Sequence, residues 1–127
     1  MTDDTRIQLR LHFGDQLTFG PGKADLLALI AEKGSIAAAG RAMDMSYKRA
    51  WSLVADMNAA FDPPLVQSSR GGPAQGGAKV TAAGADVLAQ FRRLEALLRQ
   101  SGAAELAAIT RHLRPPAQGG LSGTDVE

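Results

Sequence analysis

The sequence predicts a mainly α-helical domain with a small β component, and three observations lead to this prediction. Apolar residues recur at helical spacing in several segments between residues 23 and 113. Short alternating or apolar stretches, bounded by turn residues, are typical of a few brief strands. The length of 127 residues suits one domain with a core of its own. We expect that domain over 1–114, followed by a disordered tail over 115–127.

Composition argues against several classes of function. With no cysteine and only two histidines, the chain is not expected to hold a metal, form disulfides or perform thiol chemistry. Its aspartates form no paired-carboxylate or Ser-His-Asp pattern, so an enzyme is not expected. No apolar run approaches the length of a membrane span and no leader pattern opens the chain, which predicts a cytoplasmic protein.

The first third of the chain predicts two strands and a helix. Apolar and polar residues alternate strictly over 7–13, which is typical of a half-buried strand with His12 on its exposed face. After a turn, residues 17–19 are expected to return as a short second strand. A helix should then run from Lys23 to Lys33, with Gly34 as its stop.

Two serine-capped helices follow in close succession. Ser35 is expected to cap a helix over 36–43 that contains four alanines and a glycine, as required where another helix crosses closely. After a short turn, Ser46 caps a longer helix over 47–61. This pattern predicts a helix-turn-helix. An ordinary antiparallel helix pair is the alternative.

A strand, a glycine-rich loop and a second strand come directly after this pair. The strands are expected at 65–67 and 78–80, and the loop over 68–77 contains four glycines and a proline. Arg70 and Lys79 lie in or beside it, with no acidic residue nearby. The position favours the wing of a winged helix-turn-helix; a merely flexible hairpin or a linker between domains remains open.

The helix after the wing has a broad apolar stripe. Thr81 should cap it, and it is expected to run from residue 82 to about residue 100, with a shorter helix over 103–113. Six large apolar groups exceed what a small winged domain needs, so we expect this helix and the first strand to serve as a dimerisation surface. The interface residues predicted are Leu9, Leu11, Val87, Phe91, Leu94 and Leu98.

These segments resemble the amino-terminal domain of the molybdate-responsive ModE family of transcription regulators. The resemblance lies in Gly34-Ser35-Ile36, in Ser46-Tyr47-Lys48-Arg49-Ala50-Trp51 and in Met57-Asn58, and it continues through Leu65-Val66, Gly71-Gly72, Gly76-Gly77-Ala78, Thr81 and Gly84. It covers about residues 9–98. The related LysR-type winged domains share the serine-capped helices but differ where this chain has Tyr47-Lys48.

The resemblance implies a DNA-binding winged helix, with two departures. Ser68 and Pro73 stand where family members are often basic, which puts the exact wing contacts in doubt. Family members also continue into oxyanion-binding β-barrels, whereas 26 residues follow Ser101 here. We therefore expect no molybdate-binding domain and no cofactor, and carry over no molybdate ligand.

The function predicted is sequence-specific binding of double-stranded DNA by a homodimeric transcription regulator. The helix over 46–61 would enter the major groove with its first turn, and the wing over 65–80 would meet the backbone or minor groove. The residues expected to contact DNA are Ser35, Ser46, Tyr47, Lys48, Arg49, Ser52, Arg70 and Lys79.

Two observations bear on this prediction without deciding it. Trp51 is expected to pack in the core or to be partly buried. The net charge is only +1, but residues 35–81 carry +2 and the acidic surplus lies at the two ends of the chain. A non-specific DNA-binding protein and a protein-interaction module with the same fold remain open.

Overall fold

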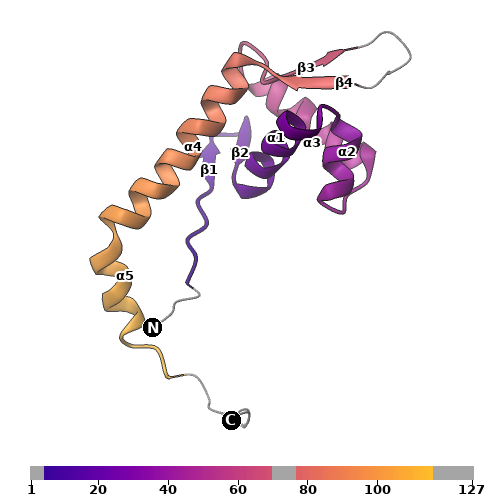
Figure 1. The fold of residues 1–127 in the computed structure, drawn as a ribbon. Helices are drawn as coiled ribbons and strands as arrows, with labels where there is room; N and C mark the ends of the chain where they lie inside the picture. The colour runs from indigo at the N-terminus through magenta and orange to yellow at the C-terminus, as the bar shows by residue number, and fades with distance from the viewer. Residues whose placement is uncertain (1–4, 70–76, 116–127) are drawn as a thin grey trace. The chain divides into compact units, whose positions relative to one another are not determined.

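The computed structural model describes residues 5–69 and 77–115 (Figure 1). In chain order its elements are β1 (Leu11–Phe13), β2 (Leu17–Phe19), α1 (Pro21–Lys33), α2 (Ile36–Ala42), α3 (Tyr47–Ala60), β3 (Val66–Ser69), β4 (Gly77–Val80), α4 (Ala82–Ser101) and α5 (Ala103–Thr110). The chain divides into two compact units, residues 1–96 and 97–127, which are described separately. The mainly helical fold with small antiparallel sheets is confirmed.

The amino-terminal hairpin is shorter than the sequence predicts. The expected strand over 7–13 is wrong in its length, because only Leu11–Phe13 pairs, in antiparallel register with Leu17–Phe19. The partner strand is three residues long and Gly20-Pro21 ends it, so no partner strand lies opposite residues 7–10. Helix α1 begins at Pro21 rather than Lys23, since proline suits the first position of a helix.

Helices α2 and α3 form the predicted helix-turn-helix. The Ser35 hydroxyl accepts a hydrogen bond from the Ala38 amide at 3.0 Å, and the Ser46 hydroxyl accepts one from Arg49 at 3.1 Å. A side chain at Gly40 would lie 2.9 Å from the Ala50 Cβ, so glycine permits the close crossing of the two helices. Asp44 turns the chain between them with a φ of 60°, in the left-handed region.

One core holds the first unit together. Phe19 and Phe91 pack edge to face with ring centroids 5.1 Å apart, joining β2 to α4. The fully buried large side chains come from β2, α1, α3 and the start of the wing, namely Phe19, Leu26, Leu27, Ile30, Met57 and Leu65. Figure 1 shows α1, α2 and α3 gathered beside the hairpin of β1 and β2, with β3 and β4 at one edge of the group. The core therefore fixes α3 relative to the wing.

The wing strands are attached to the helix-turn-helix as well as to each other. β3 and β4 pair from Val66 with Val80 to Ser69 with Gly77. Beyond the hairpin, the Ala78 amide donates to the Gly34 carbonyl at 3.0 Å, and Ser35 bridges to Gly77. The start of β4 is thus attached to the corner between α1 and α2.

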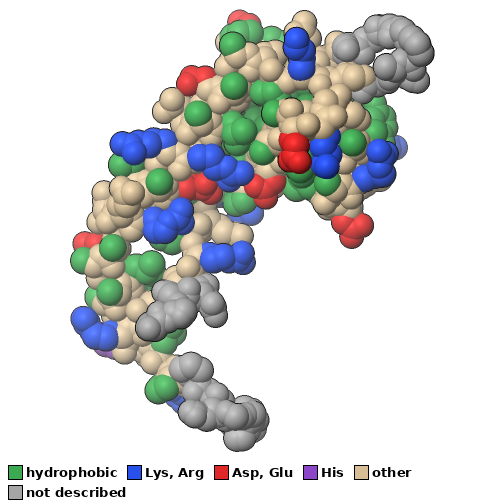
Figure 2. Space-filling model, in the orientation of Figure 1, with side chains coloured by type: hydrophobic (Ala, Val, Ile, Leu, Met, Phe, Trp, Pro, Cys, Tyr) green, Lys and Arg blue, Asp and Glu red, His purple; other side chains and the backbone are tan. Residues whose placement is uncertain are grey.

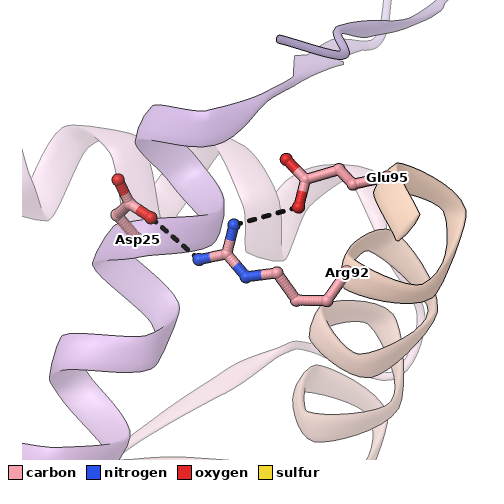
Figure 3. A network of polar contacts seen from close by, with 3 residues as sticks. All are labelled: Asp25, Arg92 and Glu95. Carbon is pink, nitrogen blue, oxygen red and sulfur yellow. Dashed lines mark hydrogen bonds and ion pairs between the residues drawn. The ribbon is translucent and has the colours of Figure 1, made fainter. Parts of the chain in front are cut away.

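An ion-pair network connects α4 to α1 (Figure 3). Arg92 bonds Asp25 of α1 at 2.8 Å and Glu95, one turn along its own helix, at 3.3 Å. These carboxylates, Asp25 above all, raise the pKa of Arg92 from its ordinary value. Because the pair with Asp25 is largely exposed, we expect it to contribute less than about 1 kcal/mol to stability. Its more important consequence is that the positive charge of Arg92 is balanced by carboxylates of the same chain.

The second unit contains the end of α4 and the helix α5. Ile109 and Leu113 are about two-thirds exposed, at 64% and 66%. Among the described residues, no helix is long and apolar enough to cross a membrane.

Candidate nucleic-acid interface

The first two turns of α3 present a group of exposed polar and basic side chains. Tyr47, Lys48, Arg49 and Ser52 are all exposed, while Ala50 faces the core. Since a helix makes a turn about every 3.6 residues, Lys48 and Ser52 lie along one line of its outer surface. Neither Lys48 nor Arg49 forms an ion pair with residues 5–69 or 77–115. The structure thus brings four of the predicted contact residues together, and two of them are cations without an ion-pair partner among the described residues.

Trp51 joins this surface instead of the core. Half of its surface, 50%, is exposed, so of the two outcomes expected, core packing or partial burial, the structure shows partial burial. It lines one hollow with Tyr47 and Lys48, and another with Ile36, Val66 and Ser68. The physical reason is its position four residues after Tyr47, on the flank of α3 beside the wing.

Asn58 holds the wing against α3, a role that the sequence analysis did not assign. Its carbonyl oxygen accepts hydrogen bonds from the Leu65 amide at 2.9 Å and the Val66 amide at 3.1 Å. Its amide nitrogen donates to the Val66 carbonyl at 2.9 Å. The Met57-Asn58 pair stood within the family resemblance, which was the only signal for this position.

Replacing Asn58 by alanine should destabilise the domain by about 1–3 kcal/mol, because the Leu65 and Val66 amides and the Val66 carbonyl lose partners in a part-buried site. Thermal unfolding followed by circular dichroism measures the effect. Gln90→Ala is the matched control, since that amide bonds Asp86 at an exposed position and its loss should cost less than about 0.5 kcal/mol. Equal effects of the two substitutions would contradict the assigned role.

Of the two basic residues predicted in the wing, the structure describes only Lys79, which does not join the group of exposed side chains on α3. In the register of the two strands, Ser68 is paired with Ala78 and Gln67 is paired with Lys79. Residues opposite each other in an antiparallel pair share a face, and successive residues alternate. Because Ser68 lines the hollow beside Trp51, Lys79 lies on the face of the hairpin that points away from that hollow. Arg70 lies outside the described residues.

On the face drawn in Figure 2, basic side chains are interspersed with acidic ones. The remaining predicted contacts are Ser35, which is half-buried before α2, and Ser46, which is exposed before α3. The hydroxyls of both are engaged as helix caps. Among the described residues, no group of three or more His, Asp or Glu side chains could hold a metal ion. Charge placement on α3, not net charge, distinguishes this surface.

Four of the predicted dimer-interface residues line a single apolar groove. Leu11, Val87, Phe91 and Leu94 surround a space of about 220 Å³ between the amino-terminal hairpin and α4. Phe13, which the sequence analysis did not select, also lines it and is 41% exposed. Its place two residues after Leu11, on the same side of the strand, was the available signal.

The predicted interface residues differ in how much surface they expose. Phe91 is only 2% exposed and packs on Phe19, so it has a core role in place of the expected interface role. It forms the floor of the groove, whereas Leu94 offers real surface, at 41%. Leu9 is half-buried against the core, and Leu98 belongs to the second unit.

The geometry described so far is that of a winged helix-turn-helix, and comparisons with known proteins agree. The CbnR DNA-binding domain, solved as a complex with DNA, superposes with a TM-score of 0.54 at 26% identity, over 69% of this chain and 95% of that chain. No model of a known protein family matches the sequence.

Curated relatives show which winged helix proteins this chain is similar to. The molybdenum-pterin-binding protein MopA of Rhodobacter capsulatus is 42% identical over 82 residues, which are 65% of this chain and 31% of MopA. The DNA-binding transcriptional dual regulator ModE of Escherichia coli K12 is 34% identical over 93 residues, 68% of this chain and 36% of ModE. This chain is therefore a relative of the ModE proteins through its winged helix domain. It spans about a third of the length of these relatives.

Proposed function

We propose that this protein is a transcription regulator that binds specific sequences in double-stranded DNA as a homodimer, with α3 as the recognition helix. The observation that carries the proposal is the exposed start of α3, where Lys48 and Arg49 lie beside Tyr47 and Ser52 and have no ion-pair partner in the part of the chain that the structure describes. In helix-turn-helix proteins the first residues of the second helix reach base edges in the major groove. Lysine and arginine there can bond guanine O6 and N7 or a phosphate.

The distribution of charge along α3 sets its proposed orientation. Both of its cations lie in the first turn, and its single carboxylate, Asp56, is exposed in the second half of the helix. DNA repels a carboxylate, so the amino-terminal half would enter the groove and the other half would lie away from it. Asn58 would then hold the wing beside the DNA as the helix docks.

The apolar groove supports the dimeric part of the proposal. Exposed Phe13 and Leu94 lie at its edge, and isolated winged domains have little need for such a surface. A second copy covering this groove would bury these side chains and present two recognition helices. Two-fold related recognition helices read two half-sites about one helical turn of DNA apart, or a multiple of it.

Selection of bound duplexes from a random DNA library tests this function directly. We expect enrichment of a two-fold symmetric motif, and light scattering of the free protein should give twice the mass of one chain. Enrichment without any shared motif would replace the regulator by a non-specific DNA-binding protein. Failure to retain any duplex at low salt, where electrostatic binding is strongest, would overturn DNA binding altogether.

A further inference from the structure

We propose that Trp51 and Tyr47 form an apolar reading surface for thymine methyl groups in the major groove. This inference rests on the proposed DNA binding and specifies which base feature is recognised. The structure brings the two rings together, because residues four apart share one side of a helix and both line the same hollow with Lys48. Their exposed fractions are 57% for Tyr47 and 50% for Trp51.

Exposed rings at this place are unusual and need an explanation. Tryptophan and tyrosine gain most by burying their large apolar area, yet about half of each of these two side chains remains in solvent on the exposed side of α3. The buried face of α3 is formed by Ala50, Val54 and Met57, so the exposed halves of the two rings lie outside the core. Their apolar area is therefore available to a ligand.

The surroundings of the rings favour DNA as that ligand. Lys48 lines the same hollow, Arg49 follows it, and the first carboxylate after them in the chain is Asp56. A protein partner that covered the two rings would also bury these cations and would need acidic groups opposite them. A duplex supplies phosphates to the cations and base edges to the rings in one surface.

Of the groups exposed in the major groove, only the thymine C5 methyl is apolar. Side chains that contact it are accordingly apolar or aromatic, whereas the other base edges are read by hydrogen bonds. The ring of Trp51 would contact the methyl group of a thymine. Lys48 would bond a neighbouring base or phosphate. Recognition would then combine one apolar and one charged contact on adjacent positions.

Deoxyuridine is the sharpest probe, because replacing thymidine by it removes only the methyl group and leaves the hydrogen-bonding edge unchanged. We would use the duplex obtained by selection, and the same duplex with each half-site thymidine replaced singly by deoxyuridine. Fluorescence anisotropy of the labelled duplex should show about fourfold weaker binding by the native protein at one or two positions, the effect of one buried methyl. At those positions Trp51→Ala should bind both duplexes equally.

Tryptophan emission gives a second readout that does not depend on a variant folding. Trp51 is the only tryptophan in the chain, so its emission should shift to shorter wavelength on the thymidine duplex and shift less on the sensitive deoxyuridine duplex. Tyr47→Ala, at the more exposed position, repeats the binding comparison without touching Trp51. Asp56→Asn is the control, because Asp56 is exposed in the half of α3 that would lie away from the DNA, and this variant should keep the full response to deoxyuridine.

The possible failures are distinguishable. If no selected duplex binds at all, the proposed function fails together with this inference. If the duplex binds but deoxyuridine has no effect at any position, or the same effect in the native protein and Trp51→Ala, DNA binding stands and methyl reading is overturned. Unchanged tryptophan emission in the bound state would also overturn it, and would assign the two rings to another partner.

Discussion

Replacing Lys48 and Arg49 together by alanine should weaken binding to the selected duplex by at least about 30-fold, since each well-placed charged contact to a base contributes about 1–3 kcal/mol. Thermal stability should not change, because both side chains are exposed and form no ion pair within the described ranges 5–69 and 77–115. Anisotropy titrations at several salt concentrations measure the loss. Where either residue contacts a phosphate, the salt dependence should fall by about one power per contact.

A control variant that loses the same charge at other positions separates recognition of bases from non-specific electrostatic attraction to DNA. Arg93 and Arg111 are exposed outside α3, and Arg93→Ala with Arg111→Ala also deletes two positive charges. This variant should keep nearly all of its preference for the selected duplex over random DNA. Equal loss in both double variants would mean that overall charge carries the binding and that α3 is not the recognition helix.

Substituting Gly84 by alanine should destabilise the domain by about 3 kcal/mol, which is the upper end for overpacking a filled site. An added Cβ would collide with the Leu65 carbonyl oxygen and lie 2.7 Å from the Val80 side chain. Neither can yield cheaply, because the Leu65 carbonyl also accepts hydrogen bonds from the Thr81 amide at 2.9 Å and hydroxyl at 3.2 Å. The melting temperature should fall by about 10–20 °C.

Gly22→Ala is the matched control for this substitution. Gly22 also lies in the first turn of a helix, α1, but a Cβ there would have no neighbour within 4 Å. The better helix propensity of alanine should leave stability unchanged or raise it by up to about 1 kcal/mol. A Gly84→Ala protein as stable as Gly22→Ala would show that α4 can move away from the start of the wing.

The sequence was most informative where local chemistry decides the structure. Ser35 and Ser46 cap their helices as predicted, because a capping hydroxyl needs only the amide three residues later. Gly34 ends α1 with a φ of 71°, which glycine adopts without strain. Strand ends were less predictable. Apolar and polar residues also alternate over 7–10, but β2 ends at Phe19, so β1 pairs with it only from Leu11 onwards.

The residues that define the candidate site divide in the same way. Lys48, Arg49, Tyr47 and Ser52 could be chosen from the sequence, since their positions in a capped helix follow from its period. Phe91 and Trp51 could not be placed, because helical periodicity does not say how much of an apolar stripe a distant strand or wing covers. Phe91 packs against Phe19, which is distant in sequence, while half of the surface of Trp51 stays exposed.

By itself the sequence determined the order of the elements, the caps and turns that separate them, and the two cations at the start of α3, because each depends on neighbours within a few residues. Only the tertiary structure decided that Asn58 bonds the wing, that Lys79 faces away from α3, and that Phe13 and Leu94 share a groove. These features join residues distant along the chain. Their positions follow from packing in three dimensions, which no local spacing encodes.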